Sequence, residues 1–153
     1  MGTELTAQAL TVTITEALAV DHANGSTNDL DFAQTYTHTY SSIANVTKRI
    51  IKLANTNLTE IATFGSDTQN GAFVRADIRY IRVTNLDASD ALQVGMDDED
   101  SDAAYTSVAA DSSIIFTGTT VEGGNGGTTL DNATALKVKG AANQQLELFI
   151  ASV

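Results

Sequence analysis

The chain has 153 residues, with 19 Asp and Glu against 8 Lys and Arg, for a formal net charge of -11. This length suits a single domain with one core, and the acidic balance argues against nucleic-acid binding because such a surface repels phosphate. The absence of Cys excludes disulfides, thiolate zinc sites, iron–sulfur clusters and cysteine nucleophiles.

Residues 1–31 predict an N-terminal strand or arm followed by a polar loop. Apolar residues alternate with Thr over residues 10–15, a period-two pattern that is typical of a half-buried strand. A helix over residues 5–20 is the alternative, but the run of β-branched Thr, Val and Ile disfavours it. Residues 21–31 are polar and would form a loop long enough to let the first strand pair with a neighbouring subunit or with a capsid shell.

Strand patterns continue along the rest of the chain. The same alternation recurs at residues 36–40, 79–84, 92–96 and 136–139. Further short runs rich in β-forming residues occur at 49–53, 59–64, 113–117 and 145–151. Turn signals separate these runs, so we expect an all-β fold, an antiparallel β-sandwich or jelly roll with about nine or ten strands. The face of Leu92, Val94 and Met96 should point into the core and set the register.

The chain contains no Pro, the residue that blunts edge strands in many sandwiches. Its edges must therefore be protected by charge, by bulges or by a partner, which makes an oligomer plausible. No stretch approaches the roughly 18 apolar residues of a membrane span, and no secretion signal is evident at the start. We expect a soluble protein with no membrane partner and no nucleic-acid partner.

Charge is unevenly distributed along the chain. Residues 1–47 have a net charge of -5, residues 48–82 of +3, and residues 83–153 of -9. The central cations are Lys48, Arg49, Lys52, Arg75, Arg79 and Arg82. We expect them to pair with carboxylates on neighbouring strands, and an anion-binding face is the alternative.

The acidic run at residues 97–102 is the one candidate for a metal site. Carboxylates at alternate positions, Asp98, Asp100 and Asp102, could converge on Ca²⁺. The run lacks the Gly and the distal Glu of an EF-hand loop and lies between two predicted strands, so a solvated hairpin tip is the favoured interpretation. We expect no other metal site and no cofactor.

No motif predicts catalysis. The glycine cluster at residues 123–127 lacks the Lys of a phosphate-binding loop, no Gly-x-Ser-x-Gly elbow is present, and His22 and His38 are far apart in sequence. A paired-carboxylate glycosidase stays open in principle. Four tyrosines lie on or beside predicted strands, and we interpret them as core or interface residues rather than as a sugar platform: Tyr36, Tyr40, Tyr80 and Tyr105.

Residues 72–87, running on to 92–96, resemble β-sandwich structural proteins of tailed bacteriophages, especially phages of cyanobacteria and marine bacteria. The resemblance rests on a strand, the Asn85-Leu86-Asp87 turn and a second strand. It continues from Tyr105 to the strand at residues 109–116, and to the closing strands at residues 136–139 and 146–152. An upstream match runs from Tyr36 to residue 65. It is a pattern of strands and turns without catalytic residues.

The resemblance implies a non-enzymatic virion protein. A short chain with one sandwich is most similar to a capsid decoration (cement) protein, made in the host cytoplasm and placed on the capsid surface. Its partners would be the major capsid protein and further copies of itself, as a homo-oligomer and most simply a homotrimer. The alternative is a receptor-binding or carbohydrate-binding module at a tail or fibre tip.

Overall fold

The computed structural model describes residues 8–20, 30–66, 73–98, 103–117, 120–121, 128–129 and 133–153. These residues are all-β: they form thirteen strands and one short 3₁₀-helix at Arg75–Asp77, with no α-helix among them. The number of strands exceeds the nine or ten expected, partly because three strands are only two residues long. Within this described part, no helix is long and apolar enough to cross a membrane. The chain divides into two compact units, Met1–Ile43 and Ala44–Val153.

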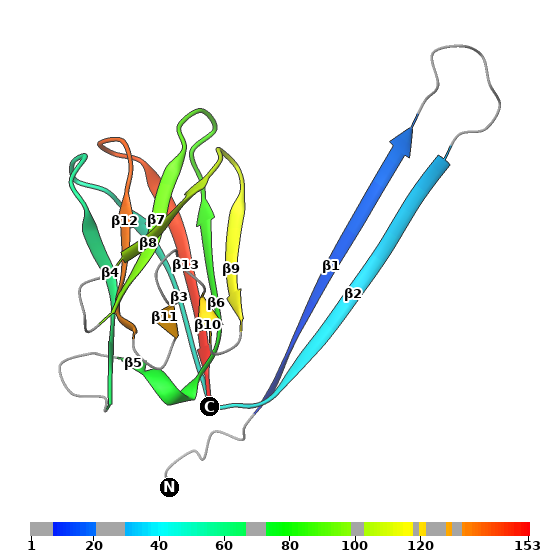
Figure 1. The fold of residues 1–153 in the computed structure, drawn as a ribbon, viewed down its shortest axis with the longest axis horizontal. Helices are drawn as coiled ribbons and strands as arrows, with labels where there is room; N and C mark the ends of the chain where they lie inside the picture. Colours follow the sequence, from blue (N-terminus) through cyan, green and yellow to red (C-terminus); the bar gives the residue numbers. More distant parts are fainter. Residues whose placement is uncertain are drawn as a thin grey trace, which may run out of the picture. The chain divides into compact units, whose positions relative to one another are not determined.

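The first unit contains a two-stranded antiparallel ribbon made of β1 (Gln8–Val20) and β2 (Leu30–Ile43) (Figure 1). The ladder runs from the pair Gln8 and Ile43 to the pair Val20 and Leu30, with a register shift between Gln8 and Leu10. The first strand, which the loop length would allow to pair with a neighbouring subunit or the shell, pairs along its length with β2 of its own chain. This unit contains residues 1–31, predicted to form a strand or arm and a polar loop, together with the rest of β2.

The second unit contains two larger sheets. The first has the order β5 (Phe73–Val74), β4 (Thr59–Gly65), β12 (Ala133–Lys139), β7 (Leu92–Asp98) and β8 (Ala103–Val108). The second has the order β3 (Asn45–Lys52), β13 (Gln145–Ser152), β6 (Ile78–Asn85) and β9 (Ser113–Thr117). A small ladder joins β10 (Thr120–Val121) to β11 (Thr128–Thr129). Pairing is antiparallel throughout these described strands except between β4 and β5.

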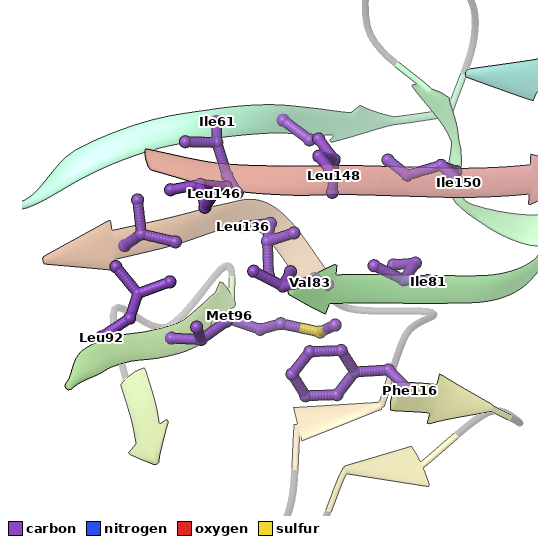
Figure 2. Packing of buried hydrophobic residues seen from close by; sticks show 14 of the residues in the cluster. Ile61, Ile81, Val83, Leu92, Met96, Phe116, Leu136, Leu146, Leu148 and Ile150 are labelled. Carbon is purple, nitrogen blue, oxygen red and sulfur yellow. The ribbon is translucent and has the colours of Figure 1, made fainter. Parts of the chain in front are cut away.

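Both larger sheets contribute to one hydrophobic cluster (Figure 2). Period-two alternation turns Leu92, Val94 and Met96 of β7 into this cluster, where each is at most 1% exposed. Strand β13 contributes Leu146, Leu148 and Ile150 in the same way. The prediction that the β7 face is buried is confirmed. Removal of this apolar surface from water is the main stabilising contribution to the unit.

Two buried amides join the loops at one end of β6 and β13. The Asn85 side chain donates to the carbonyl oxygens of Asp90 at 2.7 Å and of Ala109 at 3.0 Å. Gln144 donates to Asn85 Oδ1 at 3.1 Å and accepts a hydrogen bond from the backbone N–H of Ala141 at 2.7 Å. Because buried polar groups must be paired, these bonds hold the loops that follow β6, β8 and β12 against one another.

Candidate functional site

The acidic run at residues 97–102 begins inside a strand. Strand β7 continues through Asp98, so Asp97 and Asp98 belong to a strand and not to the predicted turn, and β8 starts at Ala103. The side chain of Asp98 and the residues Asp100 and Asp102 lie outside the described part, so the calcium hypothesis has no structural description. Among the described residues, no group of three or more His, Asp or Glu side chains could hold a metal ion.

Asp97 is the centre of a polar cluster on the outer face of the five-stranded sheet. Its carboxylate accepts a hydrogen bond of 2.9 Å from the Tyr105 hydroxyl and forms an ion pair with Lys137. The register explains this convergence, because Gly95 of β7 lies directly between Lys137 of β12 and Tyr105 of β8. Because Gly95 has no side chain, it leaves room for the side chains of Lys137 and Tyr105. Both can therefore reach the carboxylate of Asp97, two residues further along β7.

The environment of Tyr105 changes its acidity. Partial burial raises the pKa of the Tyr105 phenol to about 12, and the adjacent Asp97 carboxylate, which accepts its hydrogen bond, adds to the effect. The phenol therefore keeps its proton throughout the physiological range. At neutral pH it can donate a hydrogen bond and offer its ring as a surface, but it cannot act as a base.

A shallow groove lies beside this cluster. It has a volume of about 300 Å³ and is lined by Thr56, Asn57, Leu58, Gln93, Tyr105 and Lys139. Leu58 and Tyr105 are 46% and 40% exposed, so the groove offers an aliphatic and an aromatic surface to solvent. The amides of Asn57 and Gln93 and the ammonium of Lys139 supply hydrogen-bonding groups around these surfaces. Such a combination suits a small polar ligand with an apolar face, for example a saccharide.

The central cations take several roles. Glu147 on β13 pairs with Lys48 at 3.1 Å and with Arg82 at 2.6 Å, which agrees with the expected cross-strand pairing for these two residues. The hydrogen bond from Lys48, together with that from Arg82, holds the pKa of the Glu147 carboxyl below its ordinary value, although desolvation opposes the shift. Arg82 also lies over the ring of Phe149, with its guanidinium carbon 5.6 Å from the ring centroid.

Two other cations of the group, Arg79 and Arg49, contact backbone carbonyl oxygens where carboxylates were expected. Arg79 donates to the backbone oxygen of Ala76 at 2.7 Å, and Arg49 donates to the backbone oxygen of Ile61. Strand β3, which has one hydrogen-bonded neighbour in its sheet, carries Lys48, Arg49 and Lys52. Cations on an edge strand discourage pairing with another sheet, which is one of the forms of edge protection expected of a chain without Pro.

The β1–β2 ribbon has two chemically different faces. On one face, three Thr–Thr pairs stand opposite each other with Oγ1 atoms 3.3 to 3.4 Å apart: Thr11 with Thr39, Thr13 with Thr37 and Thr15 with Thr35. On the other, aliphatic residues of β1 stand opposite aromatic residues of β2: Leu10 with Tyr40, Val12 with His38 and Ile14 with Tyr36. We call these the threonine face and the aliphatic–aromatic face of the ribbon.

The four tyrosines occupy different environments. Tyr80 is buried and its ring meets Phe149 edge-on with the centroids 5.9 Å apart, so it is a packing residue. Tyr36 and Tyr105 are exposed, and Tyr40 is half-buried with its ring 4.4 Å from that of His38. Of the four tyrosines expected to be core or interface residues, Tyr80 is the one that lies in the core. His22 and the glycine cluster at residues 123–127 lie outside the described residues.

The groove could not be predicted from the sequence, because its lining comes from three separate parts of the chain: the loop before β4, the β7–β8 pair and the end of β12. The available signal was the alternation that places Lys137 and Lys139 on the outer face of β12. In comparisons with protein-family models, curated proteins and solved structures, nothing matches this chain.

Proposed function

We propose that the protein is a non-enzymatic structural component of a tailed-phage virion, a decoration protein that binds and stabilises the capsid shell. The observation that carries the proposal is the β1–β2 ribbon. Its described side chains at residues 8–17 and 33–43 include a single formal charge, Glu16, although the whole chain has a net charge of -11. A weakly charged, exposed sheet of this kind suits contact with other proteins. The resemblance of the chain to phage structural proteins supports the same function.

We further propose that unit Ala44–Val153 is an antiparallel β-sandwich. The support is that strands of both larger sheets contribute to one hydrophobic cluster, while the outer faces carry ion pairs such as Lys137 with Asp97 and Arg82 with Glu147. Buried inner faces and polar outer faces are characteristic of that architecture.

Binding rather than catalysis is the proposed activity. The clearest group of ionisable side chains in the described residues is Asp97 with Lys137 and Tyr105, in which the carboxylate is paired with an ammonium and the phenol has a pKa of about 12. Neither the paired Asp97 carboxylate nor the protonated Tyr105 phenol supplies a general base at neutral pH. The proposed partners are the major capsid protein and further copies of the chain as a homo-oligomer, most simply a trimer, on the capsid surface after synthesis in the host cytoplasm.

The copy number in purified particles tests this function. Quantitative mass spectrometry should find the protein in amounts comparable to the major capsid protein, and the purified chain should bind assembled shells. Amounts matching only the few copies of a tail-tip protein would overturn the capsid assignment.

The groove favours one alternative, a glycan-binding module at a tail or fibre tip. Its exposed Tyr105 ring and the amides of Asn57 and Gln93 are groups that commonly contact sugars. NMR titration with host-surface glycans tests it: saturable shifts at the groove, lost in Tyr105→Ala but kept in Tyr36→Ala, would support this module. The absence of any shift across a broad glycan set would remove it.

A further inference from the structure

The aliphatic–aromatic face of the ribbon is partly exposed, although its composition is that of a buried surface. Ile14 is 46% exposed and Tyr36, directly opposite on β2, is 51% exposed. A two-stranded ribbon with one sheet layer is only marginally stable in water, because it has no second layer against which to bury its apolar side chains. The ribbon therefore gains stability from any partner that covers this face.

We propose that the partner is the same face of another copy of the chain, with the ribbons arranged around a symmetry axis parallel to their strands. The inference rests on the proposed homo-oligomer and specifies the surface that forms it. Facing ribbons would lie about 10 Å apart, the ordinary separation of packed sheets.

The two rows of side chains make this face complementary to itself. A rotation axis parallel to the strands places β1 of one copy against β2 of the next, at the same level along the strands. The aliphatic row of Leu10, Val12 and Ile14 then meets the aromatic row of the neighbouring copy. In a dimer the contact occurs twice, once from each copy to the other. In a trimer it occurs three times, from each copy to the next, so both assemblies are closed.

The same axis also places Glu16, the one charged residue among the described side chains at residues 8–17 and 33–43 of the ribbon, against a suitable partner. Glu16 stands opposite Gln34 within the ribbon, so the axis places the Glu16 carboxylate against the Gln34 amide of the next copy. An amide can donate a hydrogen bond to a carboxylate, whereas an axis perpendicular to the strands would place β1 against β1 and lose this match. Copies of an acidic chain repel one another, and self-association is least opposed where the charge is lowest.

Cysteine cross-linking tests the arrangement, and the chain has no Cys that would interfere. The single variants Ile14→Cys and Tyr36→Cys are mixed, allowed to exchange subunits and oxidised mildly. We expect the mixed disulfide between positions 14 and 36, in preference to either homodisulfide. The matched control is Thr13→Cys mixed with Thr37→Cys, both on the threonine face. These two variants should form disulfides no faster than chains that meet only by random collision. Equal cross-linking in the two mixtures would overturn the inference.

Sedimentation supplies a second readout with a matched pair of charges. Ile14→Asp should lower the association constant at least about tenfold, a loss of about 1.4 kcal/mol, because it places a charge in the interface. Thr13→Asp, one residue away on the other face, should leave association unchanged, and an equal loss in both variants would contradict the assignment of the face. If positions 14 and 36 cross-link but the protein does not bind shells, only the proposed capsid function is removed. If the protein binds shells but these positions do not cross-link, only this inference is removed.

Discussion

The side-chain amide of Gln144 donates a hydrogen bond of 3.1 Å to the side-chain oxygen of Asn85, and the two side chains are 1% and 0% exposed. They are the buried polar residues of the described part of the chain. The pair lies 59 residues apart in sequence, and together the two amides also bind the carbonyl oxygen of Asp90. The hydrogen bonds of this network are complete only when the loops that follow β6, β8 and β12 are all in place. The network therefore couples the ends of both larger sheets.

Asn85→Ala should lower the free energy of unfolding by about 2 to 4 kcal/mol, because it leaves buried carbonyl groups and the Gln144 amide without a partner. Urea denaturation at neutral pH measures the loss. Asn45→Ala, at an exposed position on β3, is the control and should change stability by less than about 0.5 kcal/mol. A similar small effect at both positions would show that the network does not stabilise the fold.

Gly140→Ala should destabilise the protein through Gln144. A Cβ atom at position 140 would overlap the Gln144 side-chain oxygen and lie 3.0 Å from Leu53 Cδ1, so the buried amide would have to leave its partners. We expect a loss of about 1 to 3 kcal/mol. In a Gln144→Ala background the same substitution should cost much less, which a double-mutant cycle measures directly. Additive losses would contradict the coupling.

Val94→Asp should prevent folding, because Val94 is fully buried and an unpaired carboxylate there costs several kcal/mol. Circular dichroism and the dispersion of amide NMR signals report the outcome. Gln93→Asp, on the adjacent outward position of β7, should fold normally. A folded Val94→Asp protein would mean that the register of β7 differs from the one described.

Tyr105 should titrate late in an absorbance titration of the tyrosines, with a midpoint of about 12 that disappears in Tyr105→Phe. Since its pKa is raised in the folded state, the unfolded chain loses this proton first. The stability associated with Tyr105 is therefore complete below about pH 10 and declines as the pH rises toward 12. Asp97→Asn should lower the midpoint while leaving it above 10, because burial is the larger cause. An ordinary midpoint in the wild type would contradict the described contact.

Glu147→Gln should cost about 1 kcal/mol or less at neutral pH, because Lys48 is largely exposed and Arg82 is partly exposed. The pKa of Glu147 is lowered in the folded state, so its contribution is present above the ordinary carboxyl pKa and is lost as the pH falls. The stabilities of wild type and variant, measured by urea denaturation, should converge in acid. A difference that persists at low pH would show that the effect does not depend on the charge of Glu147.

Local patterns in the sequence predicted where most of the longer strands lie, although no pattern predicted β8 at Ala103–Val108. The run at residues 113–117 coincides with β9, and those at 145–151 and 92–96 fall within β13 and β7. Alternation has this power because each side chain of a strand points to the opposite face from its neighbours, whatever the strand pairs with. The turn after Asn85 was also predictable, because Asp87 accepts hydrogen bonds from the backbone N–H groups of Ser89 and Asp90, as such turns require.

Strand order and the surfaces were decided only by the tertiary structure. Alternation carries no information about partners, so nothing local indicated that β3 pairs with β13, that β1 pairs with β2 of its own chain, or that Asn85 is a buried network residue. The groove and the Asp97 cluster likewise depend on Lys137, Gly95 and Tyr105 lying side by side on three strands. The sequence by itself determined the all-β class and the inward faces, because these follow from the two-residue period of each strand. The pairing of strands depends on which distant segments bury the most apolar surface together, a property of the whole chain.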